Sequence, residues 1–79
     1  MTDKEIRENV TKTLIECRND KGISQSELAK VIKSKPTTVA SWEQGVSLPS
    51  IQMLYRLAAY YEKTLDYMYG VRDEDRTTR

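Results

Sequence analysis

Glycine and proline interrupt this chain at only five positions, and these divide it into pieces of helical length. The breaks fall at Gly22, Pro36, Gly45, Pro49 and Gly70. Helices commonly begin or end at such residues, and alternating runs of valine, isoleucine and threonine, which would indicate strands, are absent. We therefore expect an all-α domain over residues 1–70, followed by a polar, mobile tail over residues 71–79.

Apolar spacing and capping residues predict the first two helices. Over residues 3–20, apolar side chains recur on one helical face: Ile6, Val10, Leu14 and Cys17. Gly22 fits the end of this helix. Ser24 and Glu27 have the spacing of a capping box at the start of a second, short helix. The buried face of that helix is expected to contain Leu28, Ala29, Val31 and Ile32.

Three further helices are expected after a short link over residues 33–35. Pro36 suits the first position of a helix running to about Gln44, because its missing N–H would be unpaired there. It also biases Lys35 toward the extended geometry of an N-cap. Ser50 is expected to cap a fourth helix and Thr64 a fifth over residues 65–69. The core side of the fourth helix is expected to contain Ile51, Leu54, Leu57, Ala58 and Tyr61.

The composition argues against catalysis and against a membrane location. The 79 residues include no histidine, which is the usual general base, nucleophile activator and zinc ligand. There is no apolar run of ~20 residues to span a membrane and no pattern of a secretory signal. The single cysteine, Cys17, suits a reducing compartment. We expect a cytoplasmic protein that is not an enzyme and needs no metal or cofactor.

The net charge conceals an uneven distribution. Thirteen Lys and Arg against twelve Asp and Glu give +1, which by itself argues against a strongly basic nucleic-acid binder. Between residues 30 and 56, however, four cations stand against Glu43 alone, a local net charge of +3: Lys30, Lys33, Lys35 and Arg56. A few cations are enough for a small module to hold phosphates. The low net charge of the whole chain predicts weak non-specific binding to DNA.

The third predicted helix has two unlike faces. At about 100° per residue, Val39, Trp42 and the stem of Glu43 point one way. The opposite face carries small hydrogen-bonding side chains: Thr37, Ser41 and Gln44. Hydroxyls and amides can donate to or accept from base edges, and a threonine methyl can contact a thymine methyl. Two short helices joined in this way have the layout of a helix-turn-helix, whose second helix can enter the major groove.

Several motifs make the chain resemble the phage-repressor (Xre/Cro-like) helix-turn-helix domain. They are Ser-Gln-x-Glu-Leu-Ala at residues 24–29, Trp-Glu-x-Gly at 42–45 and Pro-Ser at 49–50. Arg18 stands where the family has an arginine, and the likeness covers roughly residues 14–70. The resemblance implies a compact five-helix bundle of the lambda-repressor-like type, with the second and third helices as the helix-turn-helix. It also implies DNA-binding transcriptional regulation.

The resemblance further implies roles for particular residues. Arg18 would pair with Glu43 and tie the first helix to the third. Base contacts would come from the start and middle of the third helix: Lys35, Pro36, Thr37 and Ser41. Phosphate contacts would come from Gln25 and from the loop that holds Gln44 and Ser47, and the basic stretch adds Lys33.

The turn departs from the family pattern. Lys33 stands where glycine is usual, so it must accept a left-handed backbone at a cost of about 1–2 kcal/mol, or the turn differs. Lys35 replaces a small cap residue, and Pro36 removes a side chain that often reads a base. The operator sequence therefore cannot be transferred from relatives.

Most of these residues also have a plainer interpretation. Gln25, Thr37, Ser41 and the two lysines of the turn could be ordinary solvated residues. Trp42 is expected in the core rather than as a stacking platform for bases. Three tyrosines could form a partner surface or be scattered surface residues: Tyr55, Tyr60 and Tyr67.

The leading hypothesis is a sequence-specific DNA-binding regulator, most simply a bacterial or phage-encoded repressor of phage or mobile-element type. We expect it to bind an operator in double-stranded DNA as a homodimer, because two half-sites multiply specificity. An antitoxin of a toxin–antitoxin pair is an alternative within this class. The competing hypothesis is a protein-interaction module on the same fold, with the tyrosines as its contact.

Overall fold

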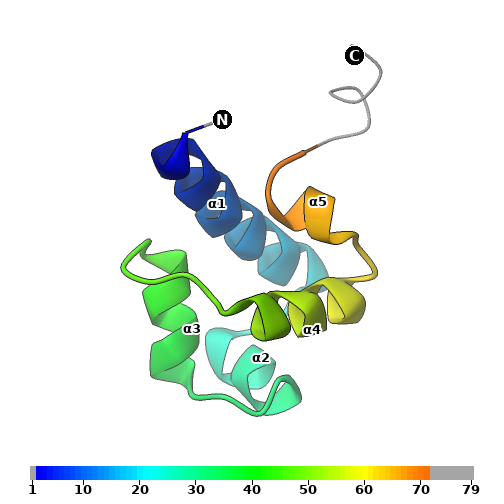
Figure 1. The fold of residues 1–79 in the computed structure, drawn as a ribbon. Helices are drawn as coiled ribbons and strands as arrows, with labels where there is room; N and C mark the ends of the chain where they lie inside the picture. The colour runs from blue at the N-terminus through cyan, green and yellow to red at the C-terminus, as the bar shows by residue number, and fades with distance from the viewer. Residues whose placement is uncertain (1, 72–79) are drawn as a thin grey trace.

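The computed structural model describes residues 2–71, which form five helices (Figure 1). Their bounds are α1 Asp3–Lys21, α2 Gln25–Val31, α3 Pro36–Glu43, α4 Ile51–Tyr61 and α5 Leu65–Met68. No strand occurs within residues 2–71, so the all-α prediction is confirmed, with helix ends within one residue of those expected. Apart from Val71, the predicted tail lies outside the described residues.

Hydroxyl side chains cap four of the five helices. Each accepts a hydrogen bond from the amide three residues later, at 3.0–3.2 Å: Thr2, Ser24, Ser50 and Thr64. The predicted capping box of α2 is confirmed, because Glu27 in turn accepts from the amide of Ser24 at 2.9 Å. Hydrogen bonds from the Ser24 backbone and side chain favour the ionised carboxylate, so they lower the pKa of Glu27.

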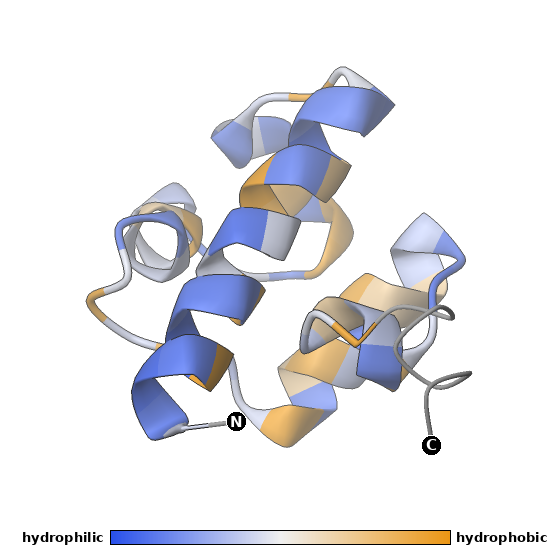
Figure 2. Cartoon of the chain, turned by 90° about the horizontal axis from the view of Figure 1, so that it is seen from above, coloured by the Kyte–Doolittle hydropathy of each residue, from blue (hydrophilic) through white to orange (hydrophobic). Residues whose placement is uncertain are grey.

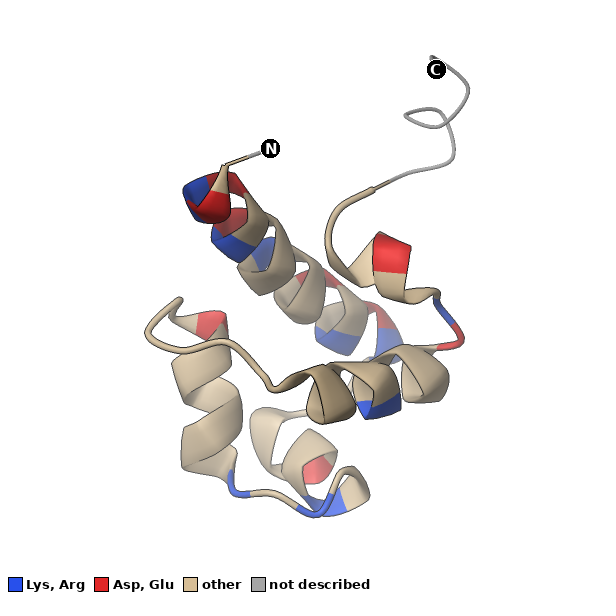
Figure 3. Ribbon diagram, in the orientation of Figure 1, with Lys and Arg blue, Asp and Glu red and all other residues tan. Residues whose placement is uncertain are grey.

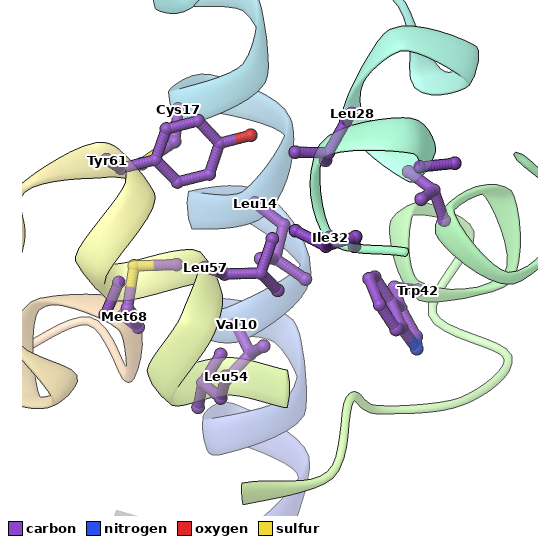
Figure 4. Packing of buried hydrophobic residues seen from close by; sticks show 13 residues of the cluster. Val10, Leu14, Cys17, Leu28, Ile32, Trp42, Leu54, Leu57, Tyr61 and Met68 are labelled. Atoms are coloured by element: carbon purple, nitrogen blue, oxygen red, sulfur yellow. The ribbon is translucent and has the colours of Figure 1, made fainter. Parts of the chain in front are cut away.

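The core gathers apolar side chains from all five helices around α1. α1 contacts α3 and α5, while α2 packs on α3 and α4 on α5. Hydrophobic positions recur at intervals along an otherwise hydrophilic α1 (Figure 2). Figure 4 shows Leu57 of α4 pointing toward Leu14 of α1, with Tyr61 beside Cys17. The largest fully buried side chains are Leu54, Leu57, Met68, Val10, Val39 and Thr13.

Two residues predicted to lie on buried faces are exposed instead. Val31 is 49% exposed and Ile51 is 66% exposed. Val31 is the last residue of α2 and Ile51 the first of α4. Periodicity gives the direction of an apolar stripe, but it does not say how far the neighbouring elements extend to cover it.

Within residues 2–71, two residues other than glycine have a left-handed backbone. Lys33, in the turn after α2, has φ 56°, and Glu62, at the end of α4, has φ 57°. Of the two alternatives that the resemblance leaves for this turn, the structure has the left-handed Lys33. Its amide donates to the Lys30 carbonyl oxygen at 3.3 Å, and the next amide, of Ser34, donates to Ala29 at 2.8 Å. A left-handed backbone costs each of these side chains about 1–2 kcal/mol relative to glycine.

The hydroxyl of Tyr61 is the one buried side-chain polar atom that has no hydrogen-bond partner within residues 2–71. Tyr61 is only 8% exposed, and burial raises the pKa of its phenol well above the ordinary value. Because the folded-state pKa lies above that of the unfolded chain, the stability tied to the neutral phenol is fully present below about pH 10. It is lost as the pH rises further.

Replacing Tyr61 by phenylalanine is expected to stabilise the protein. Removing an unsatisfied buried hydroxyl should raise the free energy of unfolding by about 1 kcal/mol at neutral pH and flatten its decline above pH 10. Urea denaturation at pH 7 and in alkaline buffer checks both effects. Tyr55→Phe, at a position 65% exposed, should change neither. A destabilised Tyr61→Phe variant would show that the hydroxyl is satisfied in solution.

Candidate nucleic-acid interface

α3 presents one face to the core and the other to solvent. Val39 and Trp42 are buried, and Thr11 of α1 donates to the Trp42 carbonyl oxygen at 3.4 Å. The prediction that Trp42 belongs to the core is therefore confirmed. On the opposite face Thr37 and Gln44 are exposed. α3 is thus anchored along one side, while hydrogen-bonding side chains project from the other.

The first residues of α3 are open to solvent. Lys35 is the N-cap, with φ −109° and ψ 147°, and its side chain makes no capping hydrogen bond. Pro36 follows in the first turn, as its sequence position predicts. Lys35, Pro36 and Thr37 are all exposed. The start of α3 therefore presents the cation of Lys35 and the hydroxyl of Thr37 to solvent. Pro36, between them, has no backbone N–H to donate.

The middle of α3 is bonded to the loop that follows it. The hydroxyls of Ser41 and Ser47 lie 2.7 Å apart and share a hydrogen bond. The amides of Val46 and Ser47 both donate to the Ser41 carbonyl oxygen, at 3.0 and 3.4 Å. Ser41 is therefore half-buried rather than fully presented to solvent. Sequence reasoning placed both serines at the interface but missed their contact, which only the path of the loop brings about.

A charged cluster joins α1, the start of α2 and the end of α3. Arg18 donates to both carboxylate oxygens of Glu43, from Nε at 2.7 Å and from Nη2 at 2.9 Å. Its Nη1 donates to the Ile23 carbonyl oxygen at 2.9 Å. These hydrogen bonds to the Glu43 carboxylate raise the pKa of Arg18 above its ordinary value. The side chains of Arg18 and Glu43 are only 16% and 7% exposed, so this bidentate pair is largely shielded from water.

Gln25 belongs to the same cluster. Its Nε2 donates to Glu43 Oε1 at 3.1 Å, a contact that the sequence did not predict. An amide nitrogen carries two hydrogens, so this bond and a bond to a phosphate are compatible. The contact holds the Gln25 side chain, at the first position of α2, beside the C-terminal end of α3.

The cations of the middle of the chain lie on its surface. Figure 3 shows them along the link between α2 and α3 and on one turn of α4, and all four are exposed: Lys30, Lys33, Lys35 and Arg56. Glu43, the one carboxylate between residues 30 and 56, is engaged by Arg18. The positive charge of this region is therefore not offset by a carboxylate from the same stretch.

The three candidate tyrosines differ in their exposure. Tyr55 is 65% exposed, whereas Tyr60 and Tyr67 are partly buried and pack against the core. Lys21 lies 4.8 Å from the centroid of the Tyr60 ring, and Lys63 lies 4.7 Å from that of Tyr67. Tyr60 and Tyr67 are therefore only partly accessible to a partner, and a partner surface that includes all three tyrosines stays a prediction.

The described part of the chain offers neither a metal-binding cluster nor a membrane-spanning helix. Residues 2–71 hold no group of three histidine, cysteine, aspartate or glutamate side chains able to bind a metal ion. None of the five helices is long and apolar enough to cross a membrane.

A family model described as helix-turn-helix matches residues 14–68 of the chain. The chain is 32% identical to multiprotein-bridging factor 1a of Arabidopsis thaliana over 57 residues, which are 72% of this chain and 40% of that protein. It is 37% identical to multiprotein-bridging factor 1 of Candida glabrata and of Saccharomyces cerevisiae, in each case over 54 residues, 68% of this chain and 36% of the relative. The matched segment thus spans about two fifths of these curated relatives. No solved structure matches the chain significantly.

Proposed function

The chain belongs to the helix-turn-helix family, of the phage-repressor-like type, and we propose that it is a sequence-specific DNA-binding transcriptional regulator. The observation that supports this is the two-sided character of α3. Its core face is anchored by Val39 and Trp42, and its outer face carries hydroxyl and amide groups. Such groups can bond base edges in the major groove, and a rigid anchor on the other side keeps them in register.

The proposed contacts divide into two sets. Base contacts come from the exposed start of α3 and its middle turn: Lys35, Pro36, Thr37 and Ser41. Phosphate contacts come from the residues that flank α3: Gln25, Lys33, Gln44 and Ser47. Phosphate contacts fix the position of the domain on the duplex, whereas base contacts carry the sequence information.

We further propose that the regulator binds as a homodimer and acts as a repressor. One eight-residue helix reads only a few base pairs, and two half-sites separated by about one helical turn multiply specificity. A duplex with two half-sites should therefore bind much more tightly than one with a single half-site. The phage or mobile-element origin stays a prediction, since the relatives described above are eukaryotic.

A second candidate function is bridging between proteins. The matched relatives are named multiprotein-bridging factors, and the described surface carries apolar side chains outside the proposed DNA contacts, such as Tyr55 and Ile51. On this proposal the domain brings a protein partner to a promoter instead of, or in addition to, reading DNA itself. It needs no catalytic group.

The DNA-binding proposal is tested by selecting a preferred site from a randomised duplex library and then titrating variants. Replacing Thr37 and Ser41 together by alanine should remove about 1–3 kcal/mol of discrimination between the selected site and a mutated site. The reason is that, on this proposal, both hydroxyls form hydrogen bonds with base edges. Fluorescence anisotropy against both duplexes measures the discrimination.

Ser47→Ala is the matched control for that double variant. It breaks the same Ser41–Ser47 hydrogen bond but leaves Ser41 and Thr37 in place, so it should weaken binding to all sequences alike. A Thr37→Ala, Ser41→Ala variant that keeps full discrimination would exclude base reading by α3. Absence of any preferred site in the selection would favour the bridging function.

A further inference from the structure

A hollow lies on the surface where the end of α2 faces α4. Its volume is about 400 Å³, and its lining is both apolar and cationic: Val31, Ile32, Lys33, Arg56 and Tyr60. None of these residues except Lys33 belongs to the proposed DNA contacts. Figure 3 shows the Lys and Arg positions of the α2–α3 link and of one turn of α4 in blue.

The apolar part of the hollow is unlike a surface that serves a phosphate backbone. Val31 is 49% exposed at its rim, Ile32 is buried beneath it, and the ring of Tyr60 forms part of the wall. DNA phosphates gain nothing from contact with such groups, whereas apolar patches rimmed by charge are typical of protein contact sites. Tyrosine and arginine are also enriched at such contacts.

The cationic part has no carboxylate in its lining. Lys33 and Arg56 stand on opposite elements of the hollow. Charge complementarity therefore calls for a partner that carries carboxylates beside apolar side chains.

Lys33 occupies its place at a conformational cost. Its φ of 56° would suit glycine without strain, yet the position carries a long cationic side chain that lines the hollow. Strained residues that persist in a fold cluster at binding sites. Unlike Glu62, which has the same backbone conformation, Lys33 places a cation in the lining of a hollow, which glycine could not supply.

We propose that this hollow binds a short acidic–hydrophobic segment of a partner protein, with an apolar side chain against Val31 and Tyr60 and carboxylates on Lys33 and Arg56. The inference rests on the second proposed function and gives its partner a chemistry. Lys33 is shared with the proposed phosphate contacts, so the segment and DNA would compete for it, whereas Val31 and Arg56 are not among those contacts.

The test uses the full chain and a fluorescein-labelled amphipathic peptide of leucine and glutamate, titrated by anisotropy. Lys33→Gly should raise the unfolding midpoint by roughly 4 °C, because it relieves backbone strain. It should nevertheless weaken peptide binding about fivefold, because a charge pair is lost. Arg56→Gln should weaken binding similarly, and a peptide with serine in place of leucine should not bind.

Glu62→Gly is the matched control. It relieves the same strain at nearly the same φ, 57°, but Glu62 does not line the hollow, so the midpoint should rise while peptide affinity stays unchanged. Equal affinity of the wild type, Lys33→Gly and Arg56→Gln variants for the peptide, or no binding at all, would overturn the proposal. Titration with the selected duplex keeps the two functions apart, because the Thr37→Ala, Ser41→Ala variant should lose DNA discrimination and still bind the peptide.

Discussion

Replacing Glu43 by alanine is expected to lower the free energy of unfolding by about 3 kcal/mol or more. Glu43 accepts two hydrogen bonds from Arg18 and one from Gln25. Without it, the guanidinium of Arg18, only 16% exposed in its side chain, would remain shielded from water with no opposite charge. Removing one partner of such a pair costs more than the pair contributes, because the other charge stays desolvated.

This loss is large for a domain of this size. Small single domains have a total stability of about 5–15 kcal/mol. The Glu43→Ala variant should therefore unfold at a much lower urea concentration than the wild type. Urea denaturation followed by the fluorescence of Trp42, the sole tryptophan of the chain, measures the change. The variant would also lose the hydrogen bonds that hold α1 and α2 to the end of α3. DNA binding should therefore weaken as well, because α3 would be held less firmly.

Two variants serve as controls for Glu43→Ala. Glu16 forms an exposed ion pair with Lys12, at 4.0 Å and with side chains 47% and 76% exposed, so Glu16→Ala should cost no more than about 0.5 kcal/mol. The double variant Arg18→Met, Glu43→Leu should recover much of the lost stability, because it leaves no unpaired charge. If Glu43→Ala costs no more than Glu16→Ala, the shielded pair contributes nothing to the fold.

Replacing Gly70 by alanine is the second change with a large expected effect, a loss of about 3 kcal/mol. Gly70 has φ 89°, a backbone region that costs alanine about 1–2 kcal/mol. A Cβ at this position would also lie 2.7 Å from Cβ and 2.8 Å from Cγ of Asn9 on α1. Overpacking of this kind adds about 1–3 kcal/mol, because the end of α5 must move away from α1.

Gly22→Ala separates the two contributions. Gly22 also has a positive φ, 72°, but a Cβ there would meet nothing within 4 Å. Gly22→Ala should therefore lower the free energy of unfolding only by the cost of the backbone conformation, about 1 kcal/mol. The difference between the two variants in urea denaturation measures the steric contribution of the close approach to Asn9. Equal losses would show that α5 is not closely packed against α1 in solution.

The candidate site was predictable from sequence in its residue types but not in its contacts. The exposed Thr37 and the buried Trp42 follow from the 3.6-residue period of an α-helix, so the two faces of the eight-residue α3 could be assigned in advance. The Ser41–Ser47 hydrogen bond depends on how the loop folds back, and the contact of Gln25 with Glu43 depends on how α2 packs on α3. The spacing of residues along one helix predicts neither of these contacts, because each joins two different elements.

What the sequence determined by itself was local. Capping hydroxyls such as Ser24 and Thr64 and the core face of α1 depend on residues three or four positions apart, where the helix fixes the geometry. The tertiary structure alone decided the exposure of Val31 and Ile51, the partial burial of Tyr60 and the hollow between α2 and α4. These depend on where separate helices end relative to one another, which is set by the packing of distant segments and not by the chemistry of any one of them.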